Sequence, residues 1–560
     1  MTSLGRLWRT VRHLKLGQMT GRVAFRLRRP KPDTAPPPRR RPWTGPWVLP
    51  AARRPSLLGP QRFSFLGVEG ELAVLGWHGP GAEKLWRYNQ HYFDDLNALG
   101  AEGRRGWHTA LLEHWLTGNP PAVGDGWEPY PTSLRICNWL KASASGLALP
   151  PAAWHSLAVQ ARWLTQRLEW HLLGNHLLVN AKALVLAGLA FDGEEAAGWL
   201  KTGLAILREQ LPEQVLQDGG QFERSPMYHA LALEDLLDLI NAAQAAQSPG
   251  LSDDLATWRA VAAKMLHWLR VMTYPDGRLA RFNDSADGIA PSNAELERNA
   301  ADLGLKAARS QLPATQPVAL LHLRDSGYVR ATWGPAVAIL DVAPVGPDYL
   351  PGHAHADTLS FELSLQGRLF IVNGGTSCYG TSARRLQERG TAAHSTVQVA
   401  EQNSSEVWSG FRVGRRARPL DVQVGAAHVS ASHDGYRWLP GNPLHTRAWR
   451  FVQCGLEVED RVSAPGLPAV ARYHLAPGLT LQLESPNVWR VVAGSELLAQ
   501  VHVQQGQGSA QASTFAPEFG VVLPAQCLVV ECEKGRALTR WKWHGVPTVG
   551  EGSTTAPQAH

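Results

Sequence analysis

Residues 352–365 read GHAHADTLSFELSL and end in alternating apolar and polar side chains. The period of two is that of a half-buried β-strand, and its apolar positions are Leu359, Phe361, Leu363 and Leu365. Carried backwards, the same parity places three polar side chains on the apolar side, namely His353, His355 and Asp357. Buried imidazoles and carboxylates need partners, so this stretch predicts a hydrogen-bond network, a metal or a substrate. The alternative is a loop with solvated histidines before the strand.

The chain is 560 residues long, which is too long for one ordinary core and predicts two or three domains. Helical patterns run from about residue 85 to residue 310, with short connections marked by Gly or Pro that are typical of antiparallel neighbours. The predicted helices cover residues 106–117, 132–147, 152–172, 175–191, 195–211, 226–247 and 253–273. The apolar residues of 175–191 cover most of that helix, which suits an inner helix of a layered toroid.

From residue 317 onward the pattern changes to short alternating segments separated by Gly, Pro, Asn and Asp. These spacings favour an antiparallel β-sandwich. The predicted strand regions are 319–333, 336–342, 358–373, 395–400, 445–453, 456–463, 479–484 and 520–531. We therefore expect a basic arm and linker over 1–84, a helical domain over 85–316 and a β-sandwich over 317–560.

The net charge of +7 is concentrated at the N-terminus, where residues 1–54 hold 14 Lys or Arg and a single acid, Asp33. The body is mildly acidic, so we expect no nucleic-acid partner. Residues 1–29 predict a basic amphipathic helix that either contacts an anionic membrane surface or packs on the body. Its apolar face would contain Leu4, Leu7, Trp8, Val11 and Leu14. Residues 30–60 contain PKP, PPP and RRRP and predict an extended linker.

The five cysteines form no C-x-x-C pair and are odd in number, which excludes a disulfide framework or a zinc ribbon. No apolar run is long enough for a transmembrane helix. Four basic residues interrupt the N-terminal apolar segment, unlike a secretion signal: Arg6, Arg9, Arg12 and Lys15. We expect a cytoplasmic protein, with the periplasm as the alternative, and the oligomeric state stays open. The 22 tryptophans suit either a core or stacking on sugar rings.

Three further stretches carry polar groups at the starts of predicted elements. GNH at 174–176 opens a predicted helix, and TAAHSTV at 391–397 leads into a strand. DGGQFERSPMYH at 218–229 is a turn before a helix, with Ser225 placed to cap it and Pro226 at its first position. Each motif alone also has a structural explanation, as an N-cap, a turn or a strand-edge histidine.

Taken jointly, the motifs in chain order are GNHLLVNAKAL, DGGQFERSPMYH, GHAHADTLSFEL, LFIVNGGTSCYG and AHSTV. In this order they resemble the heparinase II/III-like polysaccharide lyases, a family that includes alginate lyases. LWRYNQHYFDDL and YPTSLRICNWLKA are similar to its capsule-cluster branch. The resemblance covers roughly residues 85–465. It implies an incomplete (α/α) toroid followed by an antiparallel β-sandwich, and a lyase that cleaves an acidic, uronic-acid-containing polysaccharide by β-elimination.

Such a lyase removes the proton at C5 of a uronic acid and expels the glycosidic oxygen at C4. The neighbouring carboxylate must be neutralised, which Asn and His donors can do, and a base and an acid must transfer protons. By resemblance, Asn175 and His176 match the carboxylate-neutralising pair. Tyr228 matches the catalytic tyrosine and His353 the second base. Tyr379 is a candidate for the second tyrosine that some members have.

These residues come from both halves of the chain. Tyr228 lies in the helical half and His353 in the β half, so they can cooperate only if the two domains meet and form an interdomain pocket. We expect Asn175 and His176 to line the same pocket. Arg224 is a further candidate for binding the acidic polymer.

The resemblance also implies a structural zinc site in the β domain. Its matches are His355, His394 and Asn373 of the LFIVNGG segment, where the family usually has Asp. A neutral amide is a poor zinc ligand. Either Asp357 or water completes the site, or the metal is weakly bound or lost.

Two other functions remain open. A glycoside hydrolase on the same toroid needs two carboxylates across a cleft, and the available acids are Asp218, Glu223, Asp276 and Asp284. A glycan-binding or polysaccharide-assembly protein without catalysis is the second, which the missing zinc carboxylate favours. Only a lyase leaves an unsaturated, ultraviolet-absorbing sugar end.

Overall fold

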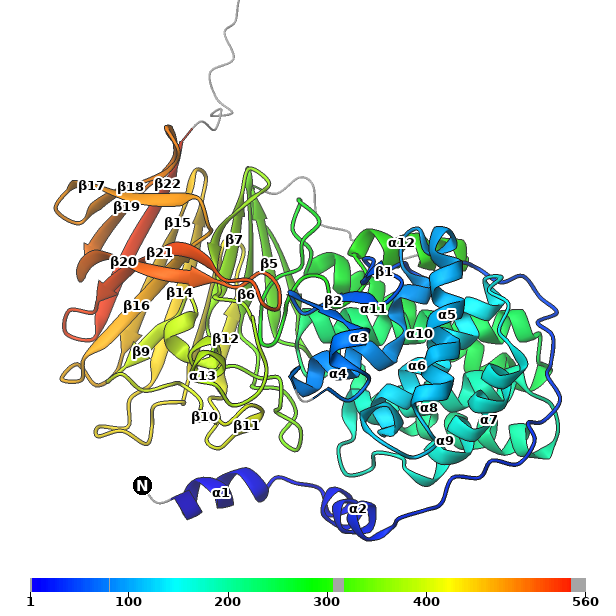
Figure 1. Cartoon of the computed structure of the whole chain (residues 1–560). Coiled ribbons are helices and arrows are strands. Elements are labelled where there is room, and N and C mark those ends of the chain that lie inside the picture. The colour runs from blue at the N-terminus through cyan, green and yellow to red at the C-terminus, as the bar shows by residue number, and fades with distance from the viewer. Residues whose placement is uncertain (1–2, 80, 306–316, 545–560) are drawn as a thin grey trace, which may run out of the picture.

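The computed structural model describes residues 3–79, 81–305 and 317–544. It contains a helical domain and a β domain that lie side by side, with the first two helices running below them (Figure 1). This confirms the predicted order of a helical toroid followed by an antiparallel β-sandwich. Residues 306–316 and 545–560, which the predicted domain ranges include, lie outside the described residues.

The helical domain agrees with the predicted helices to within a few residues at most ends. Its main helices are α4 (Lys84–Tyr92), α5 (Arg105–Gly118), α6 (Pro129–Ala144), α7 (Pro151–Gln166), α8 (Gly174–Ala190), α9 (Glu194–Gln214), α10 (Pro226–Ala246), α11 (Ser252–Val271) and α12 (Asn293–Asp302). From Leu177 to its end α8 is buried on every side, as its uninterrupted apolar sequence predicts for an inner helix.

The inner helices also share buried charges. The Lys182 ammonium on α8 donates to Asp235 and Asp238 of α10, at 2.7 and 2.6 Å. Lys141 on α6 donates to Asp238 at 2.7 Å. Buried charges are tolerated only when they are paired, so this network fixes α6, α8 and α10 in one register.

The segment before residue 85 contributes more to the fold than an arm and linker. After α1 (Ser3–Val11) and α2 (Leu16–Leu27), residues 28–54 run extended, as predicted, but their second half packs on the helical domain. The amide of Arg41 donates to the Ala190 carbonyl at 2.8 Å, and that of Val48 donates to Asn241 Oδ1 at 3.1 Å. The Arg53 guanidinium is paired with Glu234. Residues 39–54 therefore belong to the helical body.

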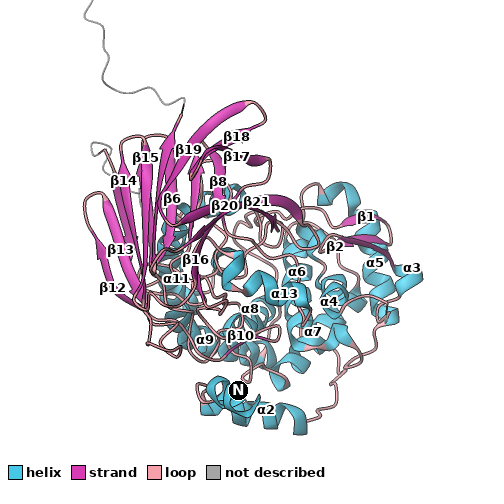
Figure 2. Ribbon diagram, turned by 90° about the vertical axis from the view of Figure 1, so that its left-hand side faces the viewer, coloured by secondary structure: helices cyan, strands magenta, loops and turns pink. Residues whose placement is uncertain are grey.

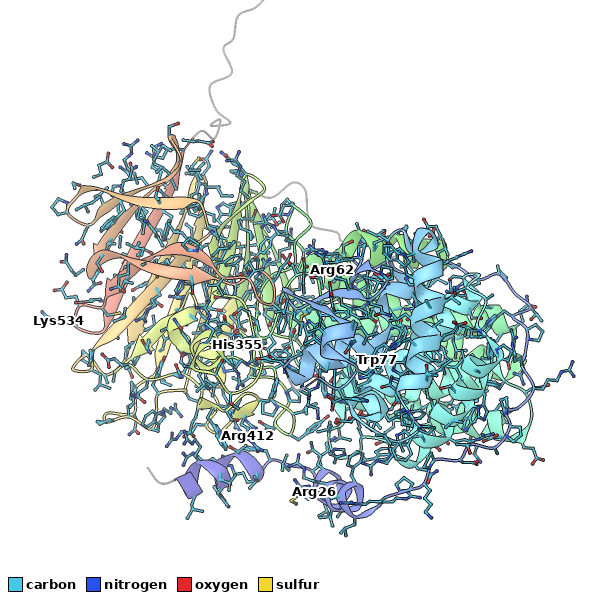
Figure 3. All side chains as sticks on the ribbon, in the orientation of Figure 1. Arg26, Arg62, Trp77, His355, Arg412 and Lys534 are labelled. Atoms are coloured by element: carbon cyan, nitrogen blue, oxygen red, sulfur yellow. The ribbon has the colours of Figure 1, made fainter. Side chains whose placement is uncertain are left out.

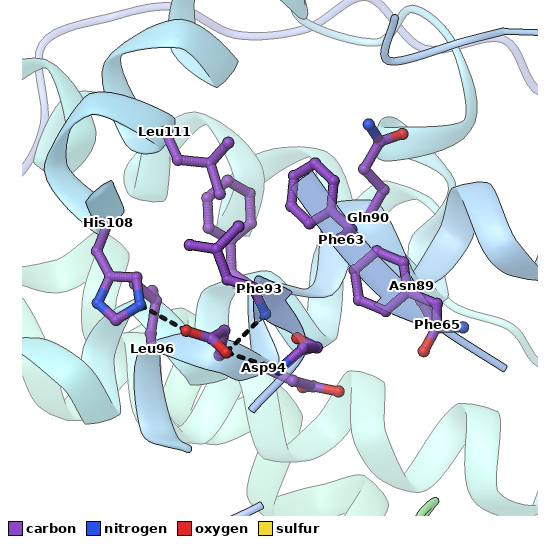
Figure 4. A pocket seen from close by; sticks show the side chains of 12 residues that line it. Phe63, Phe65, Asn89, Gln90, Phe93, Asp94, Leu96, His108 and Leu111 are labelled. Carbon is purple, nitrogen blue, oxygen red and sulfur yellow. Dashed lines mark hydrogen bonds and ion pairs between the residues drawn. The ribbon is translucent and has the colours of Figure 1, made fainter. Parts of the chain in front are cut away.

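A small sheet follows and belongs to the same body. It consists of β1 (Leu57–Gly59), β2 (Arg62–Phe65) and β3 (Val68–Glu71), and α3 (Leu72–Leu75) continues from it. Phe63 and Leu72 belong to the apolar core of the helical domain. The cavity between this sheet, α4 and α5 measures only about 20 Å³, room for about one water (Figure 4). Beside it Asp95 accepts from the Leu57 amide and from His108 Nε2, so it joins the sheet to the helices.

The β domain is a sandwich of two antiparallel sheets. One has the spatial order β20 (Gln507–Phe515), β21 (Leu523–Glu531), β16 (Ala469–Leu475), β8 (Arg368–Val372), β7 (Phe361–Leu365), β6 (Ala336–Asp341), β5 (Tyr328–Trp333) and β4 (Ala319–Leu323), with β9 (Val397–Val399) paired to β16. The other has the order β12 (Pro419–Val424), β13 (His428–His433), β14 (His445–Val452), β15 (Gly455–Val462), β22 (Arg536–Trp543), β19 (Glu496–Gln505), β18 (Val488–Ala493) and β17 (Leu479–Ser485). Aromatic side chains such as Trp449 and Trp541 fill the space between them.

The strand predicted within residues 352–365 is shorter and more deeply buried than predicted. β7 begins only at Phe361, and both of its faces are buried, including Glu362 and Ser364. Residues 353–360 form a loop, with Leu359 in the left-handed region at φ 61°. The alternation in 359–365 thus identified the strand but not its burial, because the helical domain covers the face that the polar residues occupy: the Glu362 carboxylate accepts from the Arg281 amide at 2.8 Å.

All five cysteines are free thiols. In residues 3–79, 81–305 and 317–544, no helix is long and apolar enough to cross a bilayer.

Candidate active site

The site lies where the helical and β domains join. The end of α11 and the segment after it enter the apolar core of the sandwich through residues such as Met272 and Phe282. His355 marks this junction in Figure 3, on the β-domain side and close to the helices. α13 (Ala383–Arg389) and the short hairpin of β10 (Val407–Trp408) and β11 (Arg412–Val413) lie near the same end of the sandwich (Figure 2).

Tyr228 and His353 are in direct contact across this junction. Ser225 accepts a hydrogen bond from the Tyr228 amide and Pro226 occupies the first helical position, so the predicted cap fixes where Tyr228 leaves α10. The ring of His353 packs on that of Tyr228 with centroids 3.8 Å apart. The Tyr379 hydroxyl lies 3.0 Å from that of Tyr228. Burial, and then Tyr379, raise the pKa of Tyr228 well above its usual value, so its phenol is protonated at neutral pH.

Asp284, which the sequence suggested only as a possible hydrolase acid, holds the two histidines in place. Its carboxylate lies 3.0 Å from His353 Nδ1 and 2.8 Å from His355 Nε2, and it pairs bidentately with Arg385 of α13. Burial raises the pKa of Asp284, but Arg385 and the imidazole donors outweigh burial and hold that pKa well below its usual value. Since an ionised carboxylate only accepts, His353 donates through Nδ1 and its Nε2 is free to act as a base.

Asn175 and His176 lie in the first turn of α8, on the helical side of the junction. His176 Nδ1 lies 3.1 Å from Glu169 Oε1, and the His176 ring packs on Tyr130 with centroids 4.5 Å apart. Burial lowers the pKa of His176, but Glu169 outweighs burial and raises it above its usual value. His176 is therefore suited to carry a positive charge. Asn175 beside it is half-buried.

Glu223 lies close enough to both His353 and His176 for each to act on its pKa. Its Oε2 is 3.8 Å from His353 Nε2. Burial raises the pKa of Glu223 above its usual value, and the neighbouring histidines offset that rise only in part. A Cβ placed on Gly174 would lie 3.7 Å from Glu223 Oε1 and 2.4 Å from Leu350 Cδ2, so α8 begins directly against this carboxylate. The predicted residues Asn175, His176, Tyr228 and His353 thus surround one interdomain site, together with Tyr379.

Arg224 does not contribute a free guanidinium to this site. Its three nitrogen atoms donate to the backbone carbonyls of Phe222, Asp325 and Ser326, at 3.0, 3.4 and 3.0 Å. The structure therefore places Arg224 as a connection between the two domains, which differs from the polymer-binding position expected for it. Sequence spacing could not reveal this, because residues 325 and 326 are more than a hundred positions away.

The candidate zinc ligands His355 and His394 do converge. His355 Nδ1 and His394 Nε2 lie 3.1 Å apart. Their other nitrogens donate, His355 Nε2 to Asp284 and His394 Nδ1 to the Gly390 carbonyl. Burial lowers the pKa of each histidine to about 4, so both are neutral at pH 7 and the facing nitrogens both present lone pairs. Two imidazoles on a tetrahedral zinc ion have nitrogens about 3.3 Å apart, which this pair matches.

A third ligand for that pair is not provided. The Asn373 amide accepts from the Ser395 amide at 3.1 Å and donates to the Arg281 carbonyl at 3.2 Å, so the protein already engages both of its ends. Asp357 accepts from the Asn283 amide at 3.2 Å. Within the described ranges, no group of three or more His, Cys, Asp or Glu side chains could hold a metal ion. The residues present fit two positions of a zinc site and leave the carboxylate position unfilled.

The four acids considered for a hydrolase do not form a pair. Asp218 accepts from the Ser326 amide, and Asp276 pairs with Arg278. Glu223 and Asp284 both face His353, but both oxygens of Asp284 are occupied by Arg385 and the histidines. Asp284 is therefore unavailable as a general acid or base.

The fold and site together define a toroid-and-sandwich protein with a tyrosine, histidine and asparagine site at the domain junction. The model of the heparinase II/III N-terminus matches residues 153–302, and that of the heparinase II/III-like C-terminal domain matches residues 315–544. The chain therefore belongs to the heparinase II/III-like family.

A heparin-sulfate lyase of Bacteroides stercoris is 26% identical over 330 residues, which are 53% of this chain and 48% of that protein. The chain thus spans about half the length of this relative. A crystal structure of heparinase III superposes with a TM-score of 0.62 at 20% identity, covering 82% of this chain and 76% of that one. A heparan sulfate lyase mutant from Pedobacter heparinus gives 0.60 at 18% identity, covering 95% and 88%. At 18–20% identity, the similarity to these solved structures shows a shared fold.

Proposed function

We propose that this protein is a polysaccharide lyase that cleaves an acidic, uronic-acid-containing polysaccharide by β-elimination. The contact between the Tyr228 and His353 rings, 3.8 Å apart and contributed by different domains, carries the proposal. It brings a protonated phenol and an unprotonated imidazole nitrogen to one place. Membership of a family whose curated relatives are named heparin-sulfate lyases supports the same reaction class.

The first requirement of the reaction is a neutralised carboxylate. Asn175 and the His176 imidazolium, which Glu169 stabilises, lie together in the first turn of α8 and would donate to the uronate oxygens. Preorganised donors of this kind stabilise the charge that develops as C5 loses its proton. The exposed ring of Phe411, with its centroid 5.9 Å from that of His353, offers a surface on which a sugar ring can pack.

The second requirement is proton transfer at C5 and at O4. His353 Nε2 takes the C5 proton, the C5–H electrons form the C4=C5 double bond, and the C4–O4 bond breaks. The protonated Tyr228 gives its proton to the leaving oxygen, and Tyr379, whose hydroxyl is 3.0 Å away, lies in position to relay a proton back to it. Asp284 keeps His353 in the tautomer that this step needs.

A panel of uronic-acid polysaccharides, incubated with the purified protein, tests the proposal. We expect at least one of them to yield chain ends that absorb in the ultraviolet. New reducing ends without that absorbance would identify a hydrolase, and polymer binding without new ends would identify a non-catalytic glycan-binding protein.

We also propose that His355 and His394 form part of a metal site in which Asn373 replaces the acidic ligand. The two facing lone pairs, 3.1 Å apart, support this. Zinc there would hold the loop of residues 353–357 against the 390–394 segment. No step of the reaction is assigned to it.

Replacing Asn373 by Asp is expected to tighten Zn²⁺ binding at least about tenfold, because an anionic ligand completes the pair of imidazoles. Calorimetric titration of the purified protein with zinc chloride measures this. Asn299→Asp, a buried amide in α12 far from the site, is the matched control and should leave the affinity unchanged. Equal zinc affinity in wild type and Asn373→Asp would contradict the proposed site.

We further propose that α1 and α2 dock on anionic lipid. α1 turns its polar side toward the body: Arg9 pairs with Glu406, and Trp408 Nε1 donates to Thr10. Its apolar side faces outward, with Leu4 and Trp8 74% and 61% exposed.

α2 likewise exposes a row of apolar residues, Leu16, Met19, Val23 and Leu27. Basic residues beside these rows are also exposed, among them Arg6, Arg12, Arg22 and Arg26. Apolar groups flanked by arginine suit the surface of an anionic membrane.

Replacing Leu4 and Trp8 together by Glu is expected to lower partition onto phosphatidylserine-containing vesicles about 100-fold, because two buried apolar side chains are lost from the lipid. Sedimentation with vesicles measures the bound fraction. The control replaces Val74 and Leu483, which are equally exposed but lie outside the arm. Turnover of short oligosaccharides should stay unchanged. Equal partition of both variants would contradict docking through this face.

A further inference from the structure

A cavity of about 140 Å³ lies in the β domain, on the outer face of the sheet that contains β16. Tyr473 enters the core between the two sheets, so its neighbours Arg472 and His474 point to the opposite face of β16. The strand register continues this row of outward side chains, since His474 pairs with Cys527 of β21 and Cys527 pairs with Gln511 of β20. α13 lines the same cavity. A cavity of about 150 Å³ accommodates one benzene ring, so this one has room for a single six-membered ring.

Arg472 brings an unbalanced positive charge to this cavity. Its guanidinium is half-buried and makes no hydrogen bond or ion pair with any residue that the structure describes. Burial lowers the pKa of Arg472, as expected for a guanidinium without a counter-charge. Glu388 of α13, an acid that also lines the cavity, is already engaged by the Ser377 amide and by Arg384 Nε, at 2.9 and 2.7 Å. The cavity therefore presents one cation that an anionic group can pair with.

His474 and Ser513 add hydrogen-bonding groups that lack partners. His474 is only 6% exposed, and its Nε2 lies 3.0 Å from the Ala392 carbonyl. Because a carbonyl only accepts, Nε2 carries the proton. Burial lowers the pKa of His474 to about 3, so the ring is neutral and Nδ1 is an acceptor, for which the described residues provide no donor. The Ser513 hydroxyl, in the same lining, likewise has no partner among them. Buried polar groups are normally satisfied, so these groups fit a molecule that both donates and accepts.

We infer that this cavity is a binding site for a small hydroxy acid, a monoanion about the size of one six-membered ring. The carboxylate pairs with the Arg472 guanidinium, and a hydroxyl of the same molecule donates to His474 Nδ1. A sulfate ion has no proton to donate at neutral pH and would leave His474 unsatisfied, whereas a neutral polyol would leave Arg472 unpaired. No residue assigned to the lyase reaction lines this cavity, so the inference stands independently of that reaction.

Three carbocycles with six-membered rings separate the two features of such a molecule. Quinate is a hydroxy acid, cyclohexanecarboxylate has the charge without the hydroxyls, and inositol has the hydroxyls without the charge. Calorimetric titration of the full chain is carried out also in the double variant Asn175→Ala, His176→Ala, which removes the carboxylate-neutralising pair of the active site. In both proteins we expect quinate to bind with a Kd of about 1 mM or tighter, and the other two at least about tenfold more weakly.

Replacing Arg472 by Met is expected to weaken quinate binding about 10- to 100-fold, because the charged partner of the carboxylate is lost. The variant should fold with a melting temperature at least equal to that of the wild type, since it removes a partly buried charge without a counter-charge. Arg490→Met is the matched control, a half-buried arginine of β18 in the other sheet, and should leave quinate affinity unchanged.

Unchanged quinate affinity in Arg472→Met would overturn the inference. Equal affinity for quinate and sodium sulfate would overturn it as well, because the site would then be a simple oxyanion site. So would the absence of any heat of binding with quinate up to about 10 mM, which is tenfold above the expected Kd.

Discussion

Replacing Tyr228 by Phe is expected to lower kcat about 10²- to 10⁴-fold while leaving polymer affinity nearly unchanged. The substitution removes the hydroxyl that protonates the leaving oxygen and lies 3.0 Å from Tyr379, but it keeps the ring on which His353 packs. Initial rates of ultraviolet-absorbing end formation, with calorimetric affinities for the same polymer, separate the two effects.

Tyr473→Phe is the matched control for this variant. Tyr473 is a buried tyrosine of β16 whose hydroxyl accepts from Thr539 inside the sandwich, far from the junction. It should retain the wild-type rate. A near wild-type rate in Tyr228→Phe would rule out the assigned proton donor, and a loss of folded protein would show up as a lowered melting temperature.

Replacing Asp284 by Asn is expected to reduce the free energy of unfolding by about 3–5 kcal/mol, because it leaves the Arg385 guanidinium buried without a counter-charge. Activity should fall as well, since His353 loses the carboxylate that fixes its tautomer. Urea denaturation measures the stability. The double variant Asp284→Asn, Arg385→Met removes both charges and should recover part of the stability but not the activity. A single variant as stable as the wild type would contradict this role.

The same pair has a pH signature. Because Arg385 and the histidines lower the pKa of Asp284 in the folded state, its stabilisation is present above the unfolded value of about 3.9 and is lost as the pH falls toward the folded pKa. The Asp284→Asn variant has no carboxylate at this position, so it has no such contribution to lose on acidification. The stability gap between wild type and Asp284→Asn should therefore be constant from pH 7 to about pH 5 and narrow below about pH 4.

Much of the fold followed from local patterns. The seven predicted toroid helices were correct because period, caps and Pro or Gly boundaries are encoded within each segment, as at Ser225 and Pro226. The prediction that β7 is only half-buried was wrong. What covers a strand depends on residues distant in the chain, here Arg281. Likewise the packing of residues 39–54 on the helical domain could not be read from a proline-rich composition.

The residues of the candidate site likewise fall into those that a local motif marks and those that only the tertiary structure brings together. Asn175, His176, Tyr228 and His353 could be named because short motifs surround them. The groups that position those residues could not be named from the sequence. Asp284 lies between two helices in a stretch without a motif, and only the fold brings it to Arg385, 101 positions later. Arg224 looked like a ligand because it neighbours a motif, but its partners at 325 and 326 are set by tertiary structure.

Asp284 comes from the segment that follows α11, whereas Arg385, His353 and His355 come from the β domain. The Asp284–Arg385 ion pair of the site thus also connects the segment that leaves the helical domain to the β domain. Separating the segment after α11 from the β domain would expose a desolvated ion pair, so that separation is costly. Heat or denaturant should therefore melt both domains as one cooperative unit.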